Sequence, residues 1–115
     1  MKIISILEIM LCLLLGQICI WFQSNGQFKW DFMKNNTFLV SLIGGTITSL
    51  LFIKGTALAY VVFSGKVWPS RLIGFGIGII AFAFLSFFIL GETLEPKTVF
   101  CLILSLLIVV IQVFF

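Results

Sequence analysis

One stretch of the sequence decides the fold: LIGFGIGIIAFAFLSFFIL, residues Leu72–Leu90, in which 19 consecutive residues carry no charge. A helix rises about 1.5 Å per residue, so about 20 apolar residues cross the roughly 30 Å hydrocarbon core of a bilayer. Three further apolar stretches of comparable length accompany it. We therefore predict an all-α polytopic membrane protein that forms one four-transmembrane-helix bundle. Its helices are expected near 3–22, 38–63, 72–90 and 97–115, in a single domain that spans 1–115.

The composition agrees with this fold and excludes soluble classes of protein. Hydrophobic residues make up 62% of the chain and charged residues 10%, against about 45–50% and about 25% in an ordinary soluble domain. The seven basic residues are scattered, whereas a nucleic-acid-binding surface needs them clustered. We therefore exclude a soluble enzyme, a nucleic-acid partner and a secreted disulfide scaffold. We expect a multi-pass protein of the cell's inner or plasma membrane, surrounded by membrane lipid.

The side chains that usually hold metals or cofactors are missing or isolated. The chain has no His, which removes imidazole ligands and His-based catalysis. Its three cysteines, Cys12, Cys19 and Cys101, lie in apolar stretches without a C-x-x-C spacing, which favours a packing role. No nucleophile–base pair can be recognised. We expect no metal, no cofactor and no enzymatic activity.

Turn residues predict how the helices begin and end. Pro69 is expected in the first turn of the third helix, where no backbone hydrogen bond is lost. Gly91 is expected to end that helix in the left-handed conformation. Thr93 is expected to cap the fourth helix, with Pro96 in its first turn. The second stretch is longer than one untilted span needs, so we expect it to tilt or to break near Lys54–Gly55.

An even number of spans places both termini on one side of the membrane. Each side then carries three basic residues outside the spans, so the positive-inside rule gives no orientation. The two sets are Lys2, Lys66 and Arg71, and Lys29, Lys34 and Lys97. Either the chain inserts in both orientations, or a feature other than this count fixes its direction.

Two charged residues lie inside the predicted spans, at a cost of roughly 2.5–3.5 kcal/mol each at mid-membrane. Helical rise puts Glu8 about 8 Å and Lys54 about 14 Å from the same membrane face, so an ion pair between them is geometrically allowed. The alternative is that Glu8 reaches the headgroups and Lys54 snorkels. The functional interpretation is a site that handles protons or substrate near that face. We assign substrate or proton binding to Glu8, Lys54, Tyr60 and Gln112, and a pore lining to Gln17, Trp21 and Arg71.

Small residues recur at helical spacing, which lets membrane helices approach closely. They are Gly74, Gly76 and Gly78 in the third helix, and Cys101 and Ser105 in the fourth. We assign helix packing to these five residues. Because four short helices leave little room for a protected cavity, we also predict a homodimer, with the face of Cys101 and Ser105 as its contact.

Two motifs resemble the drug/metabolite transporter superfamily. Residues 55–65, GTALAYVVFSG, resemble the G-x-A-Y-A-x-W-S-G segment of its small multidrug resistance transporters. Residues 90–94, LGETL, are similar to the L-G-E-x-L that ends the penultimate helix of a repeat in the wider superfamily. The resemblance implies a four-helix transporter. Those transporters carry an essential glutamate shortly before a Gly of helix one; here Leu13 stands three residues before Gly16, so that role is not carried over to Glu8.

Two functions follow from these observations. The first is a small secondary transporter that acts as a dimer and moves a small-molecule substrate, amphipathic or cationic, with Glu8 as a proton-coupled group. The second is a membrane accessory or assembly subunit that transports nothing itself. A subunit of a lipid-carrier flippase is a variant that the superfamily resemblance also suggests.

Overall fold

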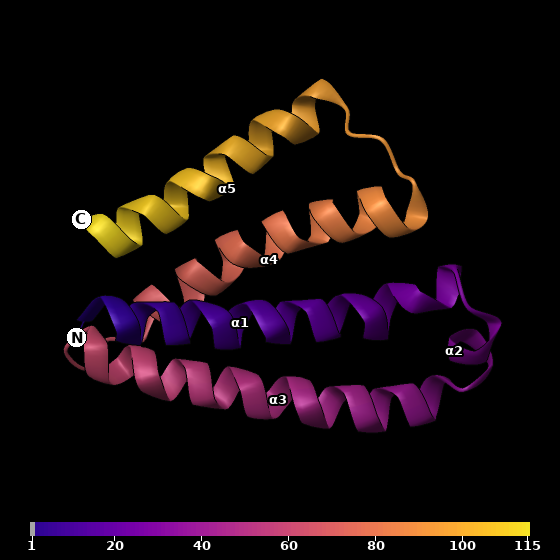
Figure 1. Ribbon diagram of the computed structural model, residues 1–115, viewed down its shortest axis with the longest axis horizontal. Helices are drawn as coiled ribbons and strands as arrows, with labels where there is room; N and C mark the ends of the chain where they lie inside the picture. The colour runs from indigo at the N-terminus through magenta and orange to yellow at the C-terminus, as the bar shows by residue number, and fades with distance from the viewer. Residues whose placement is uncertain (1) are drawn as a thin grey trace.

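The computed structural model describes residues 2–115, which form an all-α bundle (Figure 1). The elements in chain order are α1 (Lys2–Asn25), the 3₁₀ turn η1 (Gly26–Phe28), α2 (Asp31–Asn35), α3 (Thr37–Val62), α4 (Trp68–Leu90) and α5 (Pro96–Phe114). Four of these helices, α1, α3, α4 and α5, are long and apolar enough to cross a membrane. The predicted all-α four-helix bundle is confirmed, and the protein is a multi-pass membrane protein.

The helix α1 is the centre of the bundle. It packs along both α3 and α4, while α5 packs against α4. Figure 1 shows that α1 begins and α5 ends at the same end of the bundle, as an even number of spans requires. The contact between α3 and α4 is far less extensive than the contact of either helix with α1. The fold therefore leaves room beside α1, between α3 and α4.

Glycines bring α1 and α3 close together. A Cβ atom on Gly16 of α1 would lie 2.6 Å from the Phe52 ring, and one on Gly55 of α3 would lie 3.1 Å from Leu13. Carbon atoms are normally about 3.5–4.0 Å apart, so only glycine fits at these two contacts without a shift. Because Gly55 is buried within a continuous α3, the break that we considered near Lys54–Gly55 does not occur.

The three glycines of α4 face two different neighbours. Residues two apart in a helix point about 160° away from each other, so Gly76 faces α5 while Gly74 and Gly78 face α1. A Cβ atom on Gly76 would lie 2.8 Å from the carbonyl oxygen of Ser105, and one on Gly78 would lie 2.6 Å from the side chain of Gln17. The glycine pattern thus sets how closely α4 approaches both α5 and α1.

The close contact at Gly76 corrects our assignment of the dimer contact. Ser105 is only 3% exposed, since α4 covers it within the same chain, whereas Cys101 is exposed. The Ser105 hydroxyl donates a hydrogen bond to the carbonyl oxygen of Cys101, 2.9 Å away in its own helix. A face that includes Ser105 is therefore not available to a second copy of the chain.

Both ends of α4 follow from local sequence. The helix begins at Trp68, four residues before the apolar stretch, with Pro69 in its first turn as predicted. It ends at Gly91, which has a φ angle of 70° and lies in the left-handed region that glycine tolerates best. The amide of Glu92 then donates a hydrogen bond to the carbonyl oxygen of Ser86, at 3.2 Å.

The start of α5 differs from our prediction. Glu95, not Thr93, occupies the N-cap position, and its side chain makes no capping hydrogen bond. Pro96 at the first helical position explains the difference, because its fixed φ angle sets where the helix begins. The amides of Thr98 and Val99 bond to the carbonyl oxygen of Glu95, each at 3.0 Å.

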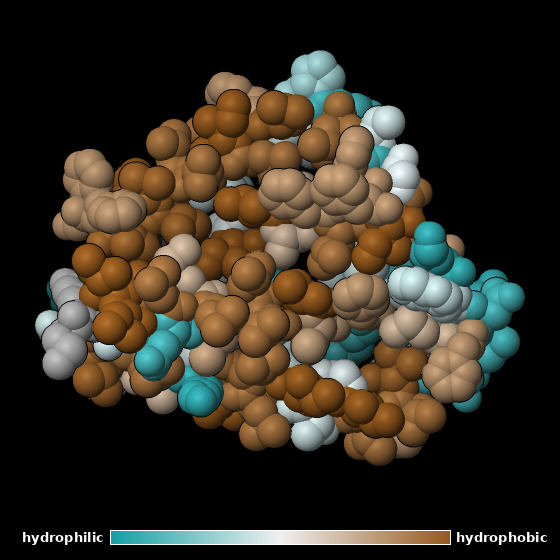
Figure 2. Space-filling view, viewed as in Figure 1, coloured by the Kyte–Doolittle hydropathy of each residue, from teal (hydrophilic) through white to brown (hydrophobic). Residues whose placement is uncertain are grey.

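The outer surface of the bundle is apolar. Figure 2 shows hydrophobic residues over the long helices, with hydrophilic residues gathered mainly at the end that holds α2 and the α4–α5 connection. Large exposed side chains such as Leu7, Val61, Phe88 and Phe100 come from all four long helices. Lipid tails are as apolar as these side chains, so this surface suits contact with a bilayer.

Candidate functional site

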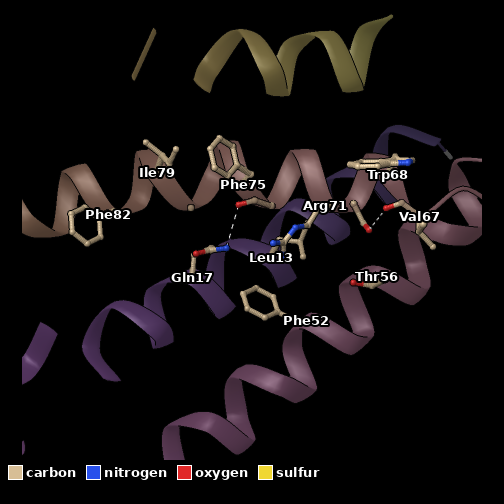
Figure 3. A pocket seen from close by; sticks show the side chains of 13 residues that line it. Leu13, Gln17, Phe52, Thr56, Val67, Trp68, Arg71, Phe75, Ile79 and Phe82 are labelled. Atoms are coloured by element: carbon tan, nitrogen blue, oxygen red, sulfur yellow. Dashed lines mark hydrogen bonds between the residues drawn. The ribbon is translucent and has the colours of Figure 1, made fainter. Parts of the chain in front are cut away.

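A cavity of about 740 Å³ lies beside α1, between α3 and α4 (Figure 3). Its volume falls in the range of roughly 300–1,000 Å³ that is usual for small-molecule sites. Its lining comes from α1, α3, α4 and the residue that precedes α4: Leu13, Gln17, Phe52, Thr56, Val67, Trp68, Ser70, Arg71, Gly74, Phe75, Gly78, Ile79 and Phe82. The cavity is partly open to its surroundings.

Arg71 is the one charged residue that lines the cavity. Figure 3 shows its side chain extending from α4 toward α1, into the cavity. Among the side chains described, the one ion pair joins Lys97 to Glu95, with 3.5 Å between the charged atoms. The wall of the cavity therefore carries a positive charge that forms no salt bridge within the described part of the chain.

Gln17 and Ser70 add polar groups near Arg71. The Gln17 amide donates a hydrogen bond from Nε2 to the carbonyl oxygen of Gly74, at 3.2 Å. The absence of side chains at Gly74 and Gly78 lets this amide lie against the backbone of α4. The Ser70 hydroxyl donates a hydrogen bond to the carbonyl oxygen of Val67, at 2.9 Å. The polar groups are thus fixed in place by the backbone of α4.

The remaining wall is mostly apolar, with Phe52 on α3 and Phe75 and Phe82 on α4. Arg71 stands about 5 Å along α4 from its first residue, and Phe82 lies about 16 Å further along. The charged group is therefore near the bundle end that holds the termini, and the aromatic groups reach toward the middle of the helices. This distribution suits a molecule with one polar end and an apolar body.

Glu8 and Lys54 do not line this cavity, so their assignment to substrate or proton binding stays a prediction. Glu8 is nine residues from Gln17, so the two point to opposite faces of α1, about 180° apart. Lys54 is two residues from Phe52 and points about 160° away from it. Both charged residues are exposed, and no salt bridge joins them among the described side chains. Their depth is compatible with the cavity, but their helical phase directs both away from it.

Tyr60, Gln112 and Trp21 also lie outside the cavity. Tyr60 is exposed on α3 beside a shallow depression, and Gln112 lines a separate hollow between α5 and the start of α4. Trp21, which we expected to line a pore, is only 2% exposed. Its indole Nε1 donates a hydrogen bond to the Ser86 hydroxyl at 3.0 Å. Trp21 therefore packs the core between α1 and α4, where both its ring and its N–H group find partners.

Sequence reasoning placed Gln17 and Arg71 in a lining and expected an aromatic-lined cavity, but it did not identify which aromatic residues form the wall. Arg71, Phe75 and Phe82 are spaced by four and seven residues, which puts them on one ridge of α4. That spacing was a readable signal. The spacing does not stand out in the sequence, however, because nearly every other position of α4 is also apolar.

No family model, no curated protein and no solved structure matches this chain. The resemblance to the drug/metabolite transporter superfamily therefore stays a hypothesis based on residues 55–65 and 90–94. In the structure the first segment forms the end of α3 and the following turn, and the second forms the last residue of α4 and most of the connection to α5. Conclusions about function consequently depend on the cavity.

Proposed function

We propose that the protein is a small membrane transporter that moves small amphipathic molecules through the cavity between α1, α3 and α4. The observation that carries this proposal is the arrangement of the lining. Arg71 lies near one end of the bundle, and aromatic side chains continue from it toward the middle. Small-molecule sites are usually apolar with a few well-placed polar groups, and this cavity has that character.

The space between α3 and α4 supplies a lateral entrance. These two helices make little contact with each other, and the cavity is partly open. A molecule dissolved in the bilayer therefore reaches the cavity sideways, between Phe52 on one helix and Phe75 on the other. An amphipathic molecule concentrates in the bilayer first, which favours this route over entry from water.

Two features that the sequence suggested are not part of this proposal. A cationic substrate is not favoured, because neither Asp nor Glu lines the cavity. Proton coupling through Glu8 is not included, because Glu8 lies on the opposite face of α1 from Gln17. The transporter proposed here is thus defined by its cavity and not by an acidic residue in its first helix.

Flux through proteoliposomes tests the proposal. Purified protein is reconstituted, and the release of neutral, cationic and anionic amphiphiles that have the same apolar body is followed over time. Thr56→Trp is designed to fill the cavity from its edge, while Ala57→Trp is the matched control, because both residues are exposed on α3 and Ala57 does not line the cavity. We expect flux that Thr56→Trp abolishes and Ala57→Trp leaves unchanged.

The flux experiment also decides between the two functions. Equal flux in both variants would contradict transport through this cavity. No flux for any amphiphile, together with a second protein that copurifies in fixed stoichiometry, would instead support the accessory or assembly subunit.

We further propose that the transporter acts as a homodimer whose contact includes Glu8 and Lys54. Both side chains are exposed on the long helices, where lipid contact is costly for a charge. Helical rise from the ends of α1 and α3 places them about 9 Å and about 12 Å from the same end of the bundle. In a two-fold symmetric pair, the Glu8 of each copy then meets the Lys54 of the other at similar depth. This contact replaces the one that we expected at Ser105.

Charge exchange tests this dimer directly. Copies with Glu8→Lys repel each other at the proposed contact, and so do copies with Lys54→Glu. Mixed in one detergent with different tags, the two variants are expected to copurify as a pair, although each is monomeric when alone. Monomeric behaviour of the wild type and of the mixture, in several mild detergents and in lipid, would contradict the dimer.

A further inference from the structure

We propose that Arg71 binds an anionic group, so that the ligand of the cavity is an amphiphile that carries a phosphate or a carboxylate. This inference rests on the proposed function and deepens it, because it names the chemical class that the cavity accepts. The shared chemistry is an oxyanion on an apolar body, whether the molecule is a membrane lipid or a smaller amphiphile.

The Arg71 side chain is poised for such a group. A guanidinium offers five N–H donors in a planar fork that matches the oxygens of phosphate and carboxylate. Within the described part of the chain, no hydrogen bond or salt bridge occupies these donors. Figure 3 shows the guanidinium directed into the cavity from α4 and not off the end of the helix.

None of the acidic side chains is placed to be a counter-ion for Arg71. It contains four acidic residues, and Asp31, Glu92 and Glu95 lie at the end of the bundle opposite Arg71. The fourth, Glu8, is on the face of α1 that points away from the cavity. Charge-assisted hydrogen bonds are about twice as strong as neutral ones, so an anion that enters this cavity meets a charged donor that no salt bridge occupies among the described residues.

The remainder of the cavity suits an apolar body attached to that anion. Phe75 and Phe82 follow Arg71 along one ridge of α4, over about 16 Å, and Phe52 and Ile79 add to the same wall. The anion therefore lies near the end of the bundle and the apolar part lies deeper between the helices. An amphiphile in a bilayer already has this orientation, so it enters through the lateral opening without turning over.

A series of ligands with one common tail separates charge from hydrophobicity. Thermal unfolding is measured in dodecyl maltoside, a neutral detergent, with added dodecyl phosphate, dodecanoate or dodecyltrimethylammonium. Inorganic phosphate alone is a further arm, since it tests whether the oxyanion suffices without a tail. A ligand that binds only the native state stabilises it by RT ln(1 + [L]/Kd), so the rise in unfolding temperature with ligand concentration gives an apparent affinity for each.

We expect dodecyl phosphate and dodecanoate to bind about tenfold or more tightly than the cationic analogue, the order expected of hydrogen bonds to a charged group. Arg71→Gln is expected to remove this preference, and Arg71→Lys to retain part of it, since lysine keeps the charge and loses the planar fork. Lys34→Gln is the matched control: it makes the same change in net charge on the exposed surface of α2, at the other end of the bundle, and it should leave the preference intact.

Several results would overturn the inference. One is equal binding of the anionic and cationic amphiphiles to the wild type. Another is an equal loss of preference in Lys34→Gln, which would indicate nonspecific attraction to a basic protein. Saturable binding of inorganic phosphate as tight as that of dodecyl phosphate would contradict an amphiphilic ligand. Because these measurements report binding alone, anion-selective binding without any flux in proteoliposomes would leave this inference standing and remove only the proposed transport.

Discussion

The contact between α4 and α5 at Gly76 gives the sharpest prediction about stability. In Gly76→Ala, the new Cβ atom would press against the Val109 side chain and would lie 2.8 Å from the carbonyl oxygen of Ser105. An ordinary contact begins near 3.4 Å, so α5 must move away by about 0.6 Å. A backbone atom cannot rotate aside as a side chain does, and the movement therefore loosens the packing of α5 on α4.

Gly74 provides a matched control in the same helix. A Cβ atom there would meet Leu13 at 3.9 Å, which is an ordinary contact. Both substitutions gain about 1 kcal/mol from the higher helix propensity of alanine, and this term cancels when they are compared. Overpacking typically costs about 1–3 kcal/mol, so we expect Gly76→Ala to be less stable than Gly74→Ala by about this amount.

Reversible unfolding by sodium dodecyl sulfate in mixed micelles, followed by far-ultraviolet circular dichroism, measures the difference. A second readout is local: a cysteine placed at Ser105, in a chain without its native cysteines, should react faster with a maleimide when Gly76→Ala is present. If Gly76→Ala is as stable as Gly74→Ala and labelling is unchanged, α5 does not pack on α4 as described.

Three further predictions concern side chains inside the bundle. Ser86→Ala should destabilise the protein by about 1–3 kcal/mol in the same unfolding assay, because it leaves the buried Trp21 N–H group without a partner. Thr48→Val should raise stability by about 1 kcal/mol, because the Thr48 hydroxyl is buried without a hydrogen-bond partner in the described structure and a methyl group has no such need. For Glu8→Gln and Lys54→Met, effects on the monomer should add within about 0.5 kcal/mol in a double-mutant cycle, since no ion pair joins the two residues in one chain.

Two control substitutions accompany these predictions. Thr46→Val removes a hydroxyl that is bonded to the Leu42 carbonyl oxygen at 2.7 Å on an exposed surface, so it should not give the gain expected of Thr48→Val. Ser105→Ala removes a hydroxyl that bonds only within its own helix, so it should cost less than Ser86→Ala. A gain in Thr46→Val as large as that in Thr48→Val, or a larger loss in Ser105→Ala than in Ser86→Ala, would contradict the hydrogen-bond assignments.

The sequence by itself determined the features that depend on local chemistry and on length. Uninterrupted apolar stretches predicted four membrane helices, because a helix must be about 20 residues long to satisfy its backbone across a bilayer. Pro69 and Gly91 marked the two ends of α4, since each residue restricts or permits a particular backbone conformation. Thr93 was the exception, because the N-terminus of α5 follows Pro96 instead.

Only the tertiary structure decided which face of each helix points inward. In a soluble protein, polar residues mark the side of a helix that faces water. A membrane helix is apolar both on the side that contacts lipid and on the side that contacts neighbouring helices. Depth could therefore be estimated for Glu8 and Lys54, whereas their orientation away from the cavity could not. For the same reason Trp21 was expected at a pore and lies in the core, while Arg71 faces a cavity whose aromatic lining residues the sequence did not identify. The hydrophobic pattern of a membrane helix does not determine which of its faces points inward. The packing of α1 against α3 and α4 determines it.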